Sequence, residues 1–218
     1  MVAKKTQIEL MPEWLTFIKK YQLSQEQAAQ FMQYLLLLQE YNELFNLTTI
    51  IEPANIIAYH FCDSLAVSDY VDFTRITMLA DVGSGAGFPG IPLKILFPHI
   101  EVTLIEVTYK KIQFLNTVIS KLGLQTITVV PFDWRTFLRK TNDPISIFVS
   151  RASLHTPELM RMFKPSCPYK DRTLVYWASK DWQPSPEDSP FFLKEELYKI
   201  KHKHRRLIFF AVPKISKQ

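Results

Sequence analysis

The chain has 218 residues, of which 47% are hydrophobic and 22% charged, and its formal net charge is +5. These values are ordinary for one globular domain with a smaller extension, and the mild positive charge favours an anionic partner. No apolar run reaches the ~18 residues of a membrane-spanning helix, and the first residues lack the apolar core of a secretory signal. Cys62 and Cys167 stand in unrelated contexts without metal-ligand spacing, which favours a reduced, cytoplasmic protein with no metal site.

Residues 1–72 are predicted to be helical throughout. A helix begins at Pro12, a residue well suited to a first helical turn. A longer helix follows in "SQEQAAQFMQYLLLLQEYNELFNL", where Ser24 and Gln27 have the spacing of a capping box and apolar residues recur at helical intervals. A third helix is expected after Pro53. This segment is therefore predicted to form a helical N-terminal extension.

Short β-branched or aromatic apolar runs alternate with possible helices from residue 76 onward. The runs are "ITMLADV", "EVTLIEV", "ITVVPF", "ISIFVS" and "RTLVYWAS". This alternation predicts an α/β fold with a parallel sheet that is covered on both faces. Beyond the Pro- and Ser-rich connector "DWQPSPEDSP", the segment "ELYKIKHKHRRLIFFAVPK" predicts two antiparallel strands around a basic turn. We therefore expect residues 73–218 to form a Rossmann-like, mostly parallel domain with an antiparallel C-terminal hairpin.

Four of the five glycines, Gly83, Gly85, Gly87 and Gly90, crowd into the loop after the first apolar run. Such crowding indicates that the backbone turns tightly or approaches a ligand closely. The loop has neither the G-K-[ST] ending of a phosphate loop nor a clear dinucleotide pattern. Glu106 ends the second strand about 20 residues further on, where a carboxylate can hydrogen-bond a ribose diol. Loop and acid together predict a site for a nucleoside-bearing cofactor.

Five stretches occur in an order typical of one bacterial enzyme family: "FNLTTI", "HFCDSL", "DVGSGAGFPGIPLKI", "EVTYKKIQFL" and "SRA". Together they resemble the RsmG (GidB) family of methyltransferases. The resemblance implies a class I S-adenosylmethionine methyltransferase fold. It also implies a cytoplasmic enzyme that transfers a methyl group from S-adenosylmethionine to N7 of a guanosine in the decoding region of 16S ribosomal RNA. S-adenosylhomocysteine would be the product, and the small ribosomal subunit the setting.

The resemblance implies roles for particular residues as well. By position, Gly83 and Phe88 correspond to cofactor contacts, Glu106 to the ribose-binding acid, and Arg151 to an arginine at the cofactor. The segment "DWRT" aligns with the part of the family that lies near the adenine. The expected cofactor-binding residues are Asp81, Gly83, Gly85, Gly87, Phe88, Glu106, Trp134, Arg135 and Arg151.

The chain departs from the family pattern at three places. Tyr59 stands where the family has an arginine, Lys180 is followed by Asp181 where the family has a glycine, and "DWRT" lacks an acid pair. These differences concern the adenine site and the RNA-binding face, whereas the glycine loop keeps the family pattern.

Guanine N7 is an acceptor that carries no proton, so methyl transfer to it needs positioning and no general base. The sequence agrees with such a reaction, because it lacks the motifs of methyltransferases that act on other atoms of a base. No [DNS]-P-P-[YFW] motif follows the fourth strand, and Cys167 precedes a proline, whereas the nucleophile of cytosine-C5 enzymes follows one. Arg151 cannot act as a base. The residues alone allow a structural salt bridge there, while the resemblance makes Arg151 the candidate catalytic residue through positioning.

Basic residues crowd near the C-terminus, and such clusters suit contacts to phosphates. A solvated hairpin tip would have the same composition. His60 and Asp63, three apart on one helix, either line the rim of the methyl-transfer pocket or fix the helix through a local hydrogen bond. Asn46 either contacts RNA or caps the helical extension. The candidate RNA-contacting residues are Asn46, His60, Asp63, Lys110, Lys111, Lys180, Lys203, Arg205 and Arg206. Neither DNA nor a membrane is an expected partner.

Three other functions are weighed against this one. The first is S-adenosylmethionine-dependent methylation of a small molecule or a protein, which the basic C-terminal cluster disfavours. The second is a non-catalytic RNA-binding or assembly factor on the same scaffold, which would not need the glycine loop and Glu106. The third is a nicotinamide dehydrogenase, disfavoured by the loop pattern and by its two prolines, Pro89 and Pro92.

Overall fold

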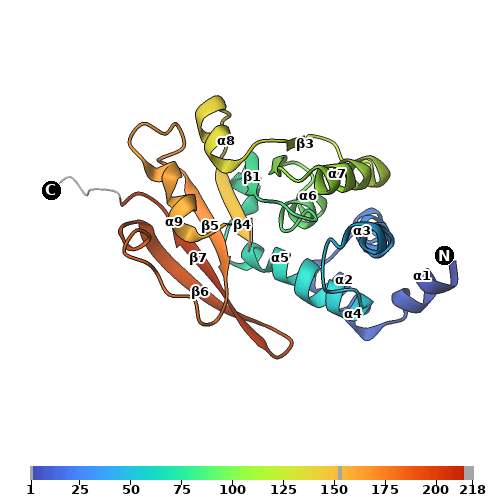
Figure 1. Ribbon diagram of the computed structural model, residues 1–218. Helices are drawn as coiled ribbons and strands as arrows, with labels where there is room; N and C mark the ends of the chain where they lie inside the picture. Colours follow the sequence, from blue (N-terminus) through green and yellow to red (C-terminus); the bar gives the residue numbers. More distant parts are fainter. Residues whose placement is uncertain (1, 152–153, 214–218) are drawn as a thin grey trace.

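The computed structural model describes residues 2–151 and 154–213. Within them, seven strands form one sheet in the order β3-β2-β1-β4-β5-β7-β6 (Figure 1). β1 to β5 run parallel, β7 is antiparallel to β5, and β6 is antiparallel to β7. The strands are β1 Met78–Val82, β2 Glu101–Ile105, β3 Ile127–Val130, β4 Ile147–Arg151, β5 Thr173–Ala178, β6 Phe192–Ile200 and β7 Lys203–Phe210. The predicted parallel sheet with an antiparallel C-terminal hairpin is confirmed.

Helices fill the N-terminal part of the chain and connect the parallel strands. They are α1 Val2–Glu9, α2 Pro12–Tyr21, α3 Gln25–Phe45, α4 Pro53–Ile56, α5 Asp63–Leu65, α6 Gly90–Leu96, α7 Tyr109–Leu122, α8 Trp134–Lys140 and α9 Thr156–Leu159. A π-helix, Ile57–Cys62, joins α4 to α5. Short 3₁₀ helices span Ala66–Asp69, Phe73–Arg75, Met160–Phe163 and Ser189–Phe191. The helical segment expected after Pro53 is therefore present, with a π-helical insertion that the sequence pattern did not indicate.

The predicted capping box at the start of α3 is confirmed. The Gln27 amide donates to Ser24 Oγ over 3.1 Å, and the Ser24 amide donates to Gln27 Oε1 over 3.0 Å. The Gln27 side chain then reaches the other way and donates to the Ile95 carbonyl over 2.9 Å. The residues that start α3 thus also fix it against the end of α6.

Each face of the sheet has its own apolar core. Leu79 belongs to the apolar cluster that contains residues of α2, α3, α6 and α7, whereas Ala80 and Val82 belong to the cluster that contains residues of α8 and α9. Successive strand residues point to opposite faces, so this alternation buries β1 on both sides. The prediction of a sheet covered on both faces is confirmed.

The N-terminal helices share one core with the sheet. Phe31 and Leu35 of α3 are fully buried in the cluster that also contains Leu104 of β2. Among the described residues, none of the helices combines the length and apolarity needed to cross a bilayer. A division of the chain at residue 72 stays a prediction. Ala152 of the "SRA" stretch and Lys214 at the end of the last predicted strand lie outside the described residues.

Candidate functional site

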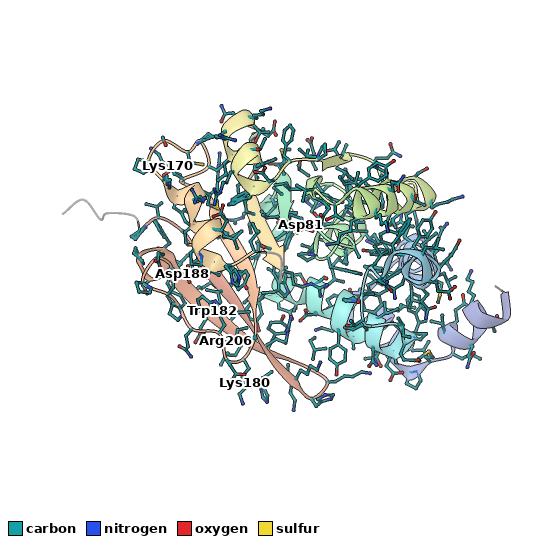
Figure 2. All side chains as sticks on the ribbon, in the orientation of Figure 1. Asp81, Lys170, Lys180, Trp182, Asp188 and Arg206 are labelled. Carbon is teal, nitrogen blue, oxygen red and sulfur yellow. The ribbon has the colours of Figure 1, made fainter. Side chains whose placement is uncertain are left out.

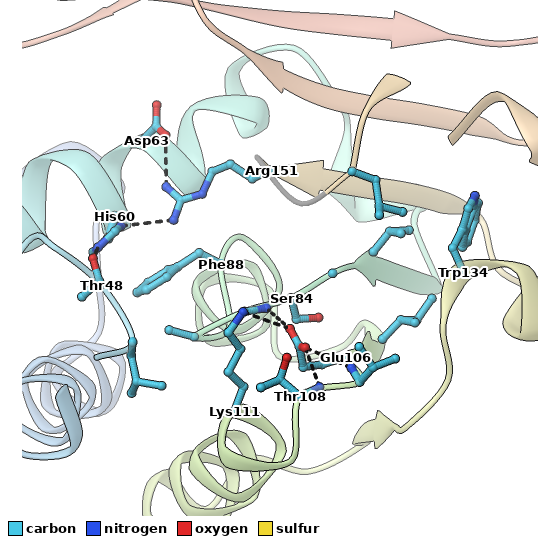
Figure 3. Close-up of a pocket in the computed structure, with 18 of the residues that line it drawn as sticks. Thr48, His60, Asp63, Ser84, Phe88, Glu106, Thr108, Lys111, Trp134 and Arg151 are labelled. Atoms are coloured by element: carbon cyan, nitrogen blue, oxygen red, sulfur yellow. Dashed lines mark hydrogen bonds and ion pairs between the residues drawn. The ribbon is translucent and has the colours of Figure 1, made fainter. Parts of the chain in front are cut away.

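A cavity of about 600 Å³ opens at the carboxyl ends of β1, β2 and β4 (Figure 3). Ligands bind at this edge in open parallel sheets, and the volume is typical of a small-molecule site. The loop after β1 forms one wall, and the π-helix and the start of β7 contribute others. The sequence-predicted residues that line the cavity are Gly83, Gly85, Phe88, Glu106, Trp134, Arg151, His60, Asp63, Lys111, Lys203 and Arg205.

Gly85 presents bare backbone to the cavity. Its φ is +61°, in the left-handed region that favours glycine. A methyl group added to its Cα would meet only the Gly83 carbonyl oxygen, 3.9 Å away. The space beside Gly85 is therefore open to a ligand that a side chain at this position would displace.

Gly87, within the loop, and Asp81, in β1, do not line the cavity. A methyl group added to Gly87 would lie 2.5 Å from Ile91 Cδ1 and 2.7 Å from the Tyr34 hydroxyl. Asp81 is fully buried, and its Oδ2 accepts from the Gly90 amide over 2.9 Å. Burial raises the pKa of Asp81 to about 7. In the structure, both residues hold the shape of the loop.

The Glu106 carboxylate closes the end of β2 and is held by three backbone amides. Oε2 accepts from Gly85 over 2.9 Å, and Oε1 accepts from Val107 over 3.0 Å and from Thr108 over 2.9 Å. The Lys111 ammonium lies 3.9 Å from Oε2 (Figure 3). Oε2 accepts only one of these hydrogen bonds, so the carboxylate is fixed in position and still able to bind a hydroxyl group through Oε2.

An aromatic stack joins the glycine loop to the π-helix. The Phe88 ring lies 4.4 Å from the His60 ring at an interplanar angle of 13°, and 5.2 Å from the Tyr34 ring. The Arg151 guanidinium carbon lies 5.0 Å from the centre of the Phe88 ring. Phe88 thereby fixes the positions of the two polar side chains that face the cavity beside it.

Asp63 gathers donors from β4, β6 and β7 around one buried carboxylate. Oδ2 accepts from Arg151 over 3.1 Å, and Oδ1 accepts from the Tyr198 hydroxyl over 2.7 Å. Arg205 donates to both oxygens, over 3.1 and 3.0 Å. Two guanidinium groups thus face one carboxylate, and this wall of the cavity is positively charged. The structure joins His60 to Asp63 through Arg151 (Figure 3).

The protonation state of His60 follows from its partners. Arg151 Nη2 can only donate, so His60 Nδ1, 3.1 Å away, accepts. The proton then resides on Nε2, which donates to Thr48 Oγ1 over 2.9 Å. Burial, with a further contribution from Arg151, lowers the pKa of His60 to about 3. The ring is neutral near pH 7, and both of its nitrogens are engaged.

Trp134 lines the cavity, whereas Arg135 points elsewhere. The Trp134 ring is 4% exposed and stacks on Phe137 with centroids 6.1 Å apart. Arg135 donates to both carboxylate oxygens of Glu158, over 2.7 and 3.1 Å. The "DWRT" segment therefore brings one of its two predicted residues to the cavity.

Four of the expected RNA-contacting residues lie outside the cavity wall. Asn46 ends α3 in a left-handed conformation with φ 51°. The Lys110 ammonium lies 5.9 Å from the Phe45 ring. Arg206 pairs with Glu195 and donates to the carbonyls of Trp182 and Lys180. Figure 2 shows Lys180, Trp182 and Arg206 close together beside the hairpin and apart from Asp81.

Some residues of the site were not predicted from the sequence. Tyr198, which donates to Asp63, lies in an ordinary strand pattern, and the amides of Val107 and Thr108 bind through backbone alone. Thr48 lies within the "FNLTTI" stretch, so this motif could have indicated that Thr48 belongs to the site. Within residues 2–151 and 154–213, no group of three His, Cys, Asp or Glu side chains is placed to hold a metal ion.

The sheet order and the cavity beyond the glycine loop define a class I S-adenosylmethionine methyltransferase fold. Solved structures agree. MtNAS in complex with MTA and tNA has a TM-score of 0.59 and 14% sequence identity, covering 92% of this chain and 82% of that one. A variant of MtNAS in complex with S-adenosylmethionine has a TM-score of 0.58 and 14% identity, covering 92% of this chain and 84% of that one.

The family model of rRNA small subunit methyltransferase G (GidB) matches residues 27–208, and the chain belongs to this family. Ribosomal RNA small subunit methyltransferase G of Staphylococcus aureus strain Newman is 46% identical over 121 residues, covering 54% of this chain and 51% of the relative. The Exiguobacterium protein of the same name is 46% identical over 107 residues, covering 49% and 45%. The matched stretch spans about half the length of these curated relatives. The resemblance noted in the sequence is confirmed.

Proposed function

We propose that this protein transfers a methyl group from S-adenosylmethionine to N7 of a guanosine in 16S ribosomal RNA, in the cytoplasm and within the small ribosomal subunit. The observation that carries the proposal is the cavity at the ends of β1 and β2, in a chain whose family is named for methylation of small-subunit ribosomal RNA. The positive wall beside it, from Arg151, Lys203 and Arg205, supports an anionic substrate.

The cavity fits S-adenosylmethionine. The bare backbone at Gly85 leaves room for a ligand, and Glu106 offers a fixed carboxylate for a ribose diol. Trp134 adds an apolar surface for the adenine. When bound, S-adenosylmethionine supplies a methyl group activated by a sulfonium centre. The residues of the chain would bind, orient and exclude water around the two reactants.

The polar groups of the cavity suit a reaction without a general base. His60 has both nitrogens engaged, and Arg151 stays protonated. Guanine N7 attacks through its own lone pair, so no proton has to be removed. We assign Arg151 a positioning role, because Asp63, the Tyr59 carbonyl and His60 hold its guanidinium in one orientation at the cavity wall.

Calorimetric titration with S-adenosylmethionine, S-adenosylhomocysteine and NAD in parallel tests the cofactor. We expect binding of the first two and none of NAD. The Gly85→Asp variant should remain folded, because open space surrounds the position and Asp tolerates a left-handed backbone. It should lose S-adenosylmethionine binding, since its carboxylate would occupy the cavity beside Glu106. A folded Gly85→Asp protein with wild-type affinity would contradict this placement of the site.

Methylation of small subunits purified from a strain that lacks this activity tests the substrate. We expect one methyl group per subunit, located at N7 of a guanosine by base-specific cleavage. Naked 16S ribosomal RNA, assayed beside intact subunits, tests whether the subunit is required. A protein that binds S-adenosylmethionine but methylates neither would point to another methyl acceptor. A protein that binds RNA but no S-adenosylmethionine would favour the assembly-factor function.

A further inference from the structure

Tyr59 is an aromatic side chain at the mouth of the cavity that the reaction described above does not use. It lies in the π-helix Ile57–Cys62, is half-buried, and lines the cavity. Its carbonyl accepts from Arg151 Nη1 over 3.0 Å, so its backbone is tied to the cavity wall. Single-turn π-helical insertions often occur at functional sites, where they redirect side chains.

The turn of the β6–β7 hairpin surrounds the Tyr59 ring with cationic and imidazole groups. Lys203 Nζ lies 4.6 Å from the ring centre, Lys201 Nζ lies 5.9 Å away, and the His202 ring lies 6.3 Å away, edge-on. Figure 1 shows the hairpin reaching past the helical segment that follows α4. An aromatic surface and cations therefore meet at one edge of the cavity.

Lys201 and Lys203 differ in their partners. Lys201 lies 3.9 Å from a Glu13 carboxylate oxygen and donates to Asn55. Lys203 is exposed, and in the part of the chain that the structure describes no carboxylate lies within ion-pair distance of it. Lys203 is thus a cation at the cavity rim whose charge is available to a phosphate.

We propose that Tyr59 and Lys203 form a binding subsite for an unstacked RNA nucleotide next to the methyl-transfer cavity. The base stacks on the Tyr59 ring and the phosphate contacts the Lys203 ammonium. This inference rests on the proposed function, because it places part of the RNA substrate beside the cofactor cavity. RNA loops are recognised in this way, through bases stacked on aromatic side chains with basic groups along the backbone.

Replacement of the Lys203 ammonium on the Tyr59 ring by an RNA base is favourable. An exposed cation–π contact changes an equilibrium by roughly 2- to 5-fold, whereas stacking of a base on an aromatic side chain contributes roughly 5- to 150-fold. The displaced ammonium gains a phosphate partner instead of water. In the free protein, the exposed contact between Lys203 and the Tyr59 ring is therefore too weak to compete strongly with the nucleotide.

The test measures, at several salt concentrations, how tightly each protein variant binds unmethylated small subunits. The variants are Tyr59→Leu, Tyr59→Phe, Lys203→Gln and Lys201→Gln. Tyr59→Leu should weaken binding by about tenfold with an unchanged salt dependence, since stacking releases no counterions. Tyr59→Phe should bind as the wild type does. Lys203→Gln should reduce the slope of log affinity against log salt by about one. Lys201→Gln, the matched control with a paired lysine, should reduce it less.

Calorimetric affinity for S-adenosylmethionine and the melting temperature should be unchanged in all four variants. Wild-type subunit affinity in Tyr59→Leu would overturn the subsite, and so would an equal loss in Tyr59→Phe. A parallel loss of S-adenosylmethionine affinity in Tyr59→Leu would assign the ring a structural role instead. A wild-type protein that binds S-adenosylmethionine but not subunits would overturn the proposed function itself, which separates the two failures.

Discussion

Gly87 and Gly85 offer a matched pair for testing which part of the loop serves the fold. Both have positive φ, +97° and +61°, so alanine strains the backbone at either position. Only at Gly87 would the new methyl group also collide, 2.5 Å from Ile91 and 2.7 Å from the Tyr34 hydroxyl. Such overpacking costs about 1–3 kcal/mol. We therefore expect Gly87→Ala to be less stable than Gly85→Ala by about that amount.

Thermal unfolding followed by circular dichroism measures the difference. For a chain of this size, each kcal/mol corresponds to about 2–4 °C, so Gly87→Ala should melt about 2–12 °C below Gly85→Ala. Urea titration gives the free energy of unfolding independently. Equal melting temperatures and equal urea midpoints for the two variants would refute the argument, since they would mean that the Tyr34 and Ile91 side chains yield without cost.

Two further predictions concern buried charges. Asp63→Asn should lower the free energy of unfolding by about 3–5 kcal/mol, because it breaks a buried ion pair, whereas Lys111→Gln, which removes a long, partly exposed pair, should cost under about 1 kcal/mol. Urea titration measures the free energy of unfolding of both variants, and equal losses would contradict this prediction. His60 and Asp81 should give opposite pH dependences. The pKa of His60 is about 3 in the fold against 6.5 ordinarily, so only the unfolded chain takes up this proton as the pH falls below 6.5, and stability falls. The pKa of Asp81 is about 7 against 3.8, so the folded chain holds a proton that the unfolded chain has lost, and stability rises as the pH falls from 7 towards 4. Each residue changes the free energy of unfolding by up to about 1.36 kcal/mol per pH unit. Urea titrations across this window should therefore show a steeper acid loss in Asp81→Asn and a shallower one in His60→Gln, and parallel curves would contradict it.

The fold was predictable where the sequence pattern is local. Apolar runs alternating with helices gave the parallel sheet, and the Ser24–Gln27 spacing gave the start of α3. The π-helix Ile57–Cys62 was not predictable, because its apolar spacing resembles that of an ordinary helix. Its Tyr59 and Cys62 carbonyls accept from Arg151 and Tyr21, two side chains that lie far from it along the chain.

The site was predictable where one loop carries it. Gly85 and Glu106 are joined by a hydrogen bond at the ends of adjacent parallel strands, as the glycine loop and strand-end acid indicate. Arg135 was expected near the adenine, but in the structure it bonds to Glu158, 23 residues further along the chain. No pattern in the sequence pairs these two residues, because their contact depends on how α8 and α9 pack.

Asp63 also has a consequence for folding during synthesis. Its donor Arg205 is 142 residues later in the chain, so a ribosome adding about 5–20 residues per second supplies it roughly 7–28 s after Asp63. Arg151 and Tyr198 follow Asp63 by 88 and 135 residues, so they are synthesised before Arg205, and until all three are in place water has to solvate part of the carboxylate. The wall that carries the positive charge of the cavity is thus among the last parts of the nascent protein to form.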